Sequence, residues 1–106
     1  MRRSLYVWQT DDDAKDAMED RIIPMIEAND FLKNRLPEKQ DKIRRQKIAF
    51  PGFSFYCIAA KPSKAQSKRV KILVMEEPHC YEAGMMSAFE KRVEGVKDPK
   101  IVTLST

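Results

Sequence analysis

The stretch VKILVMEE, residues 70–77, sets four consecutive apolar residues directly before two acidic ones. A continuous apolar run of this length is typical of a strand buried on both faces of a parallel sheet. A second stretch, KIVTLST at residues 100–106, repeats the pattern and ends in two hydroxyl side chains. Because ligands bind beyond the carboxyl ends of parallel strands, the polar residues after each run are candidate site residues.

Further elements precede these two strands. Residues 4–9 are short, apolar and rich in β-formers, which predicts another buried strand. Thr10 is placed to cap a helix whose apolar residues from Ala14 to Ile26 follow helical spacing, with a kink or restart at Pro24. Asp30 is expected to cap a short further turn that ends before Pro37.

The middle of the chain predicts a β-hairpin. Residues 43–50 and 53–60 have strand character, and Pro51-Gly52 between them is a turn pair. After the acidic strand, Ser87 to Glu90 has the pattern of a capping box that opens a helix, and Gly95 is expected to end that helix. The order strand, helix, hairpin, strand, helix, strand predicts one α/β domain with a mainly parallel sheet.

Composition excludes several classes. The 106 residues contain no apolar run long enough to span a membrane, so we expect no membrane partner. Two cysteines are too few for a disulfide scaffold, and Cys57 within an alternating run is expected to be a buried thiol. His79 and Cys80 lie near the two acids, but their spacing fits no familiar metal-binding element, and we do not expect zinc.

Charge is strongly segregated along the chain. Residues 10–30 carry eight acidic and two basic side chains, whereas residues 31–71 carry twelve basic and two acidic ones. A basic block of that size attracts phosphate, but it is equally expected of a solvated face that balances the acidic helix.

The acidic and hydroxyl strand ends resemble the ATPase domain of phage terminase large subunits, the motors that package viral DNA. The resemblance is nearest to the lambda-type branch. Three further segments match in the same order, so that it covers nearly the whole chain: residues 5–10, 20–26 and 59–69. It implies one partial domain over residues 1–106, with a P-loop NTPase sheet of the RecA-like (ASCE) type, an inserted β-hairpin and no P-loop strand.

The resemblance also implies roles for four residues. Glu76 falls where the family has the magnesium-coordinating aspartate of its Walker B motif, so the side chain is one methylene longer. Glu77 falls on the catalytic glutamate, and Ser105 and Thr106 fall on the motif that couples hydrolysis to DNA movement. The cofactors of the parent domain would be ATP and Mg²⁺.

No G-x-x-x-x-G-K-[ST] motif occurs in this sequence, so the backbone cradle and the lysine for the β- and γ-phosphates are absent from it. We therefore expect an internal piece of a motor, from a truncated, split or degraded gene, that binds no nucleotide tightly and does not hydrolyse ATP alone. The parent motor implies double-stranded DNA and terminase or portal subunits as partners, in the cytoplasm of a host bacterium. The strand at residues 100–104 would be an open sheet edge that favours self-association.

Two other interpretations remain open. One is a small module that binds nucleic acid or protein through a basic surface with interleaved aromatic rings, formed by Arg44, Arg45, Lys47, Lys61, Lys64, Lys68, Arg69, Phe50, Phe53, Phe55 and Tyr56. Because those aromatic residues alternate on the predicted hairpin, core packing is the simpler explanation for them. The other interpretation is an inert remnant that only folds.

Overall fold

The computed structural model describes residues 2–36, 43–44, 46–61 and 69–105. Its sheet has six strands in the order β2-β3-β4-β1-β5-β6. Four strands run parallel to one another: β4 (Phe53–Ala59), β1 (Arg2–Trp8), β5 (Ile72–Glu76) and β6 (Lys100–Leu104). On the other side of β4, β3 (Lys47–Phe50) pairs antiparallel with β4, and β2 (Ile43–Arg44) pairs antiparallel with β3. The predicted α/β class, element order and mainly parallel sheet are confirmed.

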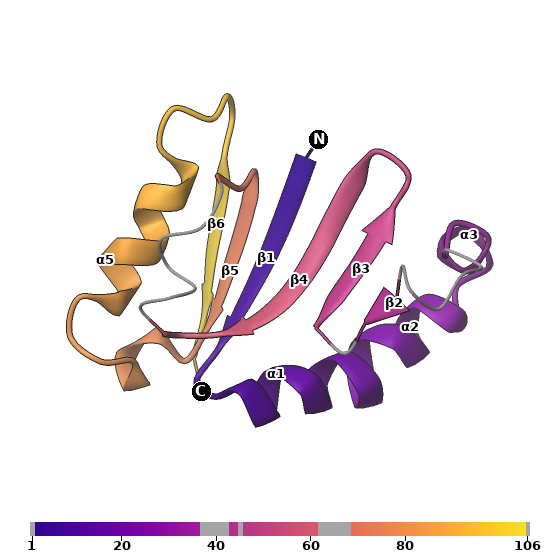
Figure 1. Cartoon of the computed structure of the whole chain (residues 1–106), viewed down its shortest axis with the longest axis horizontal. Helices are drawn as coiled ribbons and strands as arrows, with labels where there is room; N and C mark the ends of the chain where they lie inside the picture. Colours follow the sequence, from indigo (N-terminus) through magenta and orange to yellow (C-terminus); the bar gives the residue numbers. More distant parts are fainter. Residues whose placement is uncertain (1, 37–42, 45, 62–68, 106) are drawn as a thin grey trace.

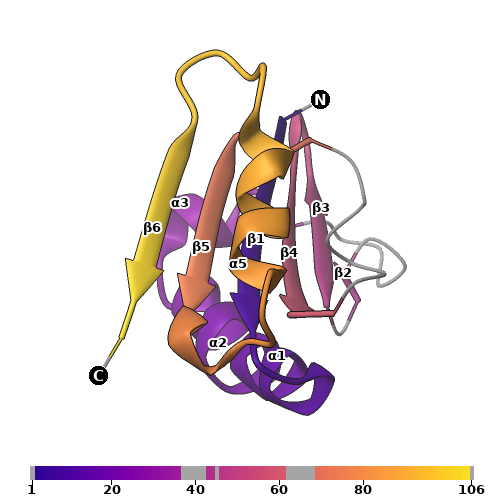
Figure 2. The same cartoon turned by 90° about the vertical axis from the view of Figure 1, so that its left-hand side faces the viewer.

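Helices cover both faces of the sheet. One face carries α1 (Asp11–Ala17), the π-helical turn η1 (Met18–Ile22), α2 (Ile23–Glu27) and α3 (Asp30–Lys33), and the other carries α5 (Met85–Glu90) with the 3₁₀ turn η4 (Lys91–Val93) (Figures 1 and 2). Side chains along β1 point alternately to the two faces of the sheet. Leu5 and Val7 pack with Phe89 on the α5 side, whereas Tyr6 and Trp8 pack on the α1 side.

The first helical segment follows its local signals closely. The Thr10 hydroxyl accepts a hydrogen bond from the Asp13 N–H at 3.1 Å, as expected of an N-cap. Pro24 lies in the first turn of α2, directly after the π-helical turn, so the predicted restart is confirmed. The predicted cap at Asp30 is wrong: Asn29 caps α3 through Oδ1, because its extended backbone aims the amide at the Leu32 N–H.

The hairpin forms around Gly52, whose φ of 86° favours glycine. The strand predicted over residues 43–50 is instead two short strands, since β2 folds back to pair with β3. Cys57 on β4 is fully buried, as predicted, and Phe50 lies in the core with it.

The segment after β5 differs from prediction at its helix start. The helix α5 begins at Met85 with Gly84 as its N-cap, so Ser87 lies inside it and the predicted capping box is wrong. Gly84 has a φ of 85°, and this left-handed backbone starts the helix earlier than the serine pattern indicates. Burial on both faces of β5 holds only in part: Leu73 and Met75 are fully buried, but Ile72 is 38% exposed.

Strand β6 forms an outer edge of the sheet, as predicted. It pairs only with β5 among the described strands, and every residue of β6 is exposed.

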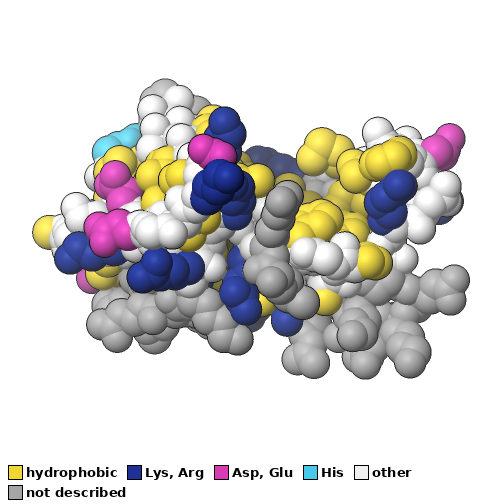
Figure 3. All heavy atoms as spheres, turned by 90° about the horizontal axis from the view of Figure 1, so that it is seen from above, with side chains coloured by type: hydrophobic (Ala, Val, Ile, Leu, Met, Phe, Trp, Pro, Cys, Tyr) yellow, Lys and Arg dark blue, Asp and Glu magenta, His cyan; other side chains and the backbone are white. Residues whose placement is uncertain are grey.

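Viewed from above, the molecule shows the ends at which the parallel strands begin, with hydrophobic side chains gathered over the side of α2 and α3 (Figure 3). In the described part of the chain no helix is both long and apolar enough to cross a membrane.

Candidate functional site

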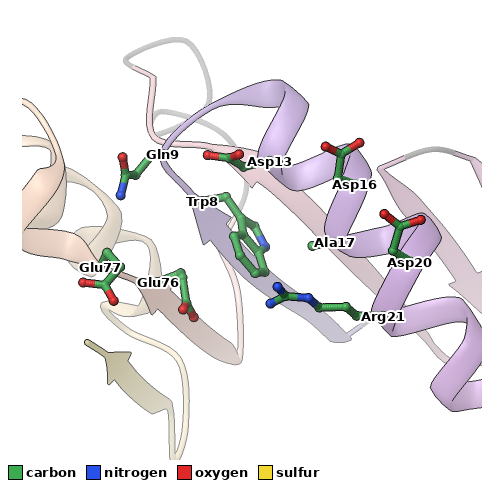
Figure 4. Close-up of a pocket in the computed structure, with 9 residues that line it drawn as sticks. All are labelled: Trp8, Gln9, Asp13, Asp16, Ala17, Asp20, Arg21, Glu76 and Glu77. Atoms are coloured by element: carbon green, nitrogen blue, oxygen red, sulfur yellow. The ribbon is translucent and has the colours of Figure 1, made fainter. Parts of the chain in front are cut away.

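A cavity of about 600 Å³ lies at the carboxyl ends of β1 and β5, the edge where the sequence predicts a site. Its floor is formed by residues that end these two strands, and its far wall belongs to α1 and η1 (Figure 4). The residues that line it are Trp8, Gln9, Asp13, Asp16, Ala17, Asp20, Arg21, Glu76 and Glu77.

Acidic side chains dominate this cavity. Asp13, Asp16 and Asp20 follow one another at spacings of three and four residues, which places them along one face of the helical segment. Glu76 and Glu77 lie on the opposite side, and Arg21 supplies the only guanidinium among the lining residues (Figure 4). The cavity therefore suits a cation better than an anion.

Glu76 is held in place by a neighbouring strand. The Tyr6 hydroxyl on β1 donates a hydrogen bond of 2.8 Å to Glu76 Oε2, and the Tyr6 ring stacks on Trp8 with centroids 4.7 Å apart. Burial, reinforced by the bond to Glu76 and its negative charge, raises the pKa of the Tyr6 phenol well above its ordinary value. Tyr6 thus stays a hydrogen-bond donor at neutral pH and fixes one oxygen of the carboxylate.

Glu77 occupies a strained position at the end of β5. Its φ of 50° and ψ of 54° are left-handed, a conformation that costs a non-glycine residue about 1 kcal/mol. The Glu77 N–H donates to the Leu104 carbonyl oxygen at 2.6 Å, so the pairing with β6 holds this backbone. The side chain is 15% exposed, and Glu77 Oε2 lies 3.3 Å from Nε2 of His79.

Ser105 comes close to the acids only through the backbone. In the register of the sheet Glu76 lies opposite Leu104, which brings the residue after Leu104 to the same edge. Ser105 is exposed and does not line the cavity within the described residues. Thr106 lies outside those residues.

The donor set fits a magnesium ion but not a triphosphate by itself. Mg²⁺ is usually held by one or two carboxylates together with waters and substrate phosphates, and Glu76 offers such a carboxylate at the cavity. A nucleotide's phosphates would meet mainly negative charge here, with Arg21 as the compensating group.

In the described part of the chain, the basic residues proposed for a nucleic-acid- or protein-binding surface contact separate parts of the fold. Lys61 pairs with Asp11 at 2.5 Å, Lys47 lies over the Tyr56 ring at 5.4 Å, and Arg69 packs against Gly95. Phe50 is buried, Phe55 and Tyr56 are partly buried against the core, and Phe53, which stacks on Phe50, is exposed. The aromatic rings thus belong largely to the core, and Arg45, Lys64 and Lys68 lie outside the described residues.

Sequence reasoning missed Tyr6 and the aspartate wall. Tyr6 shares the alternating face of Trp8, and parallel pairing sets that face beside Glu76, a relation that needs the strand register. The spacing of Asp13, Asp16 and Asp20 was visible in the sequence as one helical face, but helix capping already explained the first aspartates.

Comparison with known proteins gives one positive finding. No curated protein matches the chain significantly. The family described as phage terminase large subunit gpA, ATPase domain, matches residues 2–106, and the mixed, mostly parallel sheet is consistent with a partial P-loop NTPase-like fold. The chain therefore belongs to the family of phage terminase large subunit gpA ATPase domains.

Proposed function

We propose that this chain supplies the Walker B and coupling segment of an ATPase that drives the packaging of phage DNA. The observation that carries the proposal is the pair Glu76-Glu77 at the carboxyl end of β5, inside an acidic cavity and beside β6. A magnesium ligand and a water-activating base are needed together at such an edge, because phosphoryl transfer depends on charge neutralisation and positioning.

The roles divide between neighbouring residues. Glu76 would hold Mg²⁺, which supplies charge neutralisation at the phosphates, and Tyr6 is the positioning residue that orients its carboxylate through the 2.8 Å hydrogen bond. Glu77 would accept the proton of the attacking water. Ser105 and Thr106 would couple hydrolysis to movement of DNA.

Phosphate binding and DNA binding would be supplied by other protein segments. A phosphate-binding loop is required beside β6, and ATP, double-stranded DNA and terminase or portal subunits are the partners of the assembled motor. Packaging of this kind takes place in the host bacterial cytoplasm. The isolated chain is expected to show no sustained Mg²⁺-dependent ATP turnover.

The test is a fusion that places a P-loop strand and helix from a terminase of this family before residue 2. Glu77→Gln should lower ATP turnover by about 100-fold while nucleotide binding is retained, because only the water loses its base. Glu76→Ala should weaken Mg²⁺-nucleotide binding instead. Glu82→Gln, which changes an exposed acid nearby, is the matched control. Equal and mild effects of the Glu76 and Glu77 variants would refute the assignment.

A further inference from the structure

A second cluster of side chains borders the acidic cavity, formed by Glu77 at the cavity and by the 3₁₀ turn η3 (Pro78–Cys80) that follows it. Glu77, His79 and Cys80 each present one ligand atom there, and these atoms all lie within 4.8 Å of one another. Contrary to the expectation from sequence spacing, we propose that these three residues bind a zinc-class divalent ion, with Zn²⁺ as the preferred metal.

The turn that carries the cluster is fixed at several points. The Cys80 N–H donates to the Glu77 carbonyl at 3.0 Å, and the Tyr81 N–H donates to the Pro78 carbonyl at 3.1 Å. Tyr81 also anchors the end of the turn on the sheet, because its hydroxyl donates to the Val7 carbonyl at 2.9 Å. Pro78 restricts its own backbone in the first position of the turn. Little further ordering is needed to bring the ligands together.

The distances suit tetrahedral coordination. Zinc bonds of about 2.0–2.2 Å to nitrogen and oxygen, at a tetrahedral angle, separate the two ligand atoms by about 3.4 Å. The observed separation of His79 Nε2 and Glu77 Oε2 is 3.3 Å. The Cys80 thiol is exposed and needs only a small side-chain adjustment to complete a three-ligand site.

The ligand types select the metal. Imidazole and thiolate suit Zn²⁺ and related transition ions, whereas Mg²⁺ and Ca²⁺ prefer oxygen atoms alone. His79 is 60% exposed, so an ion reaches the cluster from solvent and keeps an open position for water. The site differs in this way from the cavity around Glu76, where the acidic lining residues offer carboxylate oxygens.

Zinc at this turn would engage Glu77, the residue assigned above as the base. A bound zinc ion would withdraw this carboxylate from water activation, and this consequence rests on the proposed function. The metal site itself rests only on the geometry of the turn, and direct metal binding tests it.

The experiment titrates the reduced full chain with Co²⁺, whose absorption reports tetrahedral geometry and thiolate coordination, and then displaces it with Zn²⁺. We expect saturable binding with a thiolate-to-metal band, displacement by Zn²⁺ and no displacement by excess Mg²⁺. His79→Asn and Cys80→Ser should each weaken binding by at least about tenfold, and Cys80→Ser should abolish the thiolate band. Glu77→Gln should weaken binding without removing that band.

Two variants serve as controls. Glu82→Gln changes an exposed acid outside the cluster, and Cys57→Ala removes the buried thiol, so both should bind Co²⁺ as the unaltered chain does. Absence of saturable binding, or equal binding after His79→Asn or Cys80→Ser, would overturn the proposal. Loss of zinc binding would leave the turnover test of Glu77 unaffected, so the two failures are distinguishable.

Discussion

Strands β5 and β6 are adjacent, parallel and equal in length, yet one face of β5 is buried and no residue of β6 is. In β5 the side chains of Leu73 and Met75 are fully buried beneath Phe89 and Val93. In β6 the equally apolar Ile101 and Val102 are 44% and 43% exposed. An apolar strand pattern therefore specifies strand formation, whereas burial depends on what packs on either side.

The largest expected effect concerns packing in the two strands. Leu73→Ala should lower the free energy of unfolding by about 3 kcal/mol, because it leaves a cavity in a closed core. Ile101→Ala on β6 should lower it by less than about 1 kcal/mol, since water already reaches that side chain. Urea denaturation of both variants measures the difference. Similar losses would show that β6 is covered in solution.

The buried Cys57 thiol on β4 should make the stability of the fold depend on alkaline pH. Burial raises the pKa of Cys57 from 9.0 to about 12. The Cys57 thiol therefore holds its proton more tightly in the folded state than in the unfolded state. The stability that this difference contributes is fully present below pH 9 and is lost as the pH rises from 9 through about 12. Unfolding free energy should fall in this window by about 1.4 kcal/mol per pH unit for this group.

Cys57→Ala isolates that contribution. At pH 7 the variant and the unaltered chain should differ only through packing, and at pH 10.5 the variant should regain about 2 kcal/mol relative to it. Urea denaturation at both pH values provides the measurement. A stability difference that is the same at both would contradict the raised pKa.

Removing a hydroxyl should matter more in the centre than at the edge. Tyr6→Phe breaks the hydrogen bond that ties β1 to Glu76 and should cost about 1.5 kcal/mol, because the acceptor is charged. Thr103→Val on the exposed β6 removes a hydroxyl with an expected effect within about 0.5 kcal/mol. Thermal unfolding of the two variants tests this. Equal losses of stability would show that the hydrogen bond from Tyr6 to Glu76 does not stabilise the fold.

The smallest change in stability is expected from a charge on the edge strand. Val102→Lys should alter the unfolding free energy by less than about 0.5 kcal/mol, since the side chain is already solvated. It should nevertheless suppress self-association, because lysine protects an open edge from pairing with another chain. Light scattering over a concentration series compares the two proteins. A chain that is already monomeric at high concentration would refute the predicted association.

Local signals in the sequence were reliable where one short segment decides the outcome. The Thr10 cap, the restart near Pro24, the turn at Gly52 and the strand at residues 100–104 were all predicted and are all present. Errors arose where two local signals competed. Asn29 took the cap expected of Asp30, and Gly84 started α5 before the capping-box pattern at Ser87.

The candidate site was predictable only in its position along the chain. Two acids after an apolar strand indicated a site at the carboxyl edge, and the cavity includes both. Tyr6 and the wall formed by Asp13, Asp16 and Asp20 could not be assigned, because their approach depends on strand register and on how α1 packs.

The sequence by itself determined the element order, the α/β class and the acidic ends of the strands, since these follow from hydrophobic periodicity and turn chemistry over a few residues. Only the tertiary structure decided which apolar strand is buried, which hydroxyl holds Glu76, and that Glu77, His79 and Cys80 meet on one turn. The physical reason is that burial and side-chain contact depend on neighbours distant along the chain, and these are set by the packing of the whole sheet.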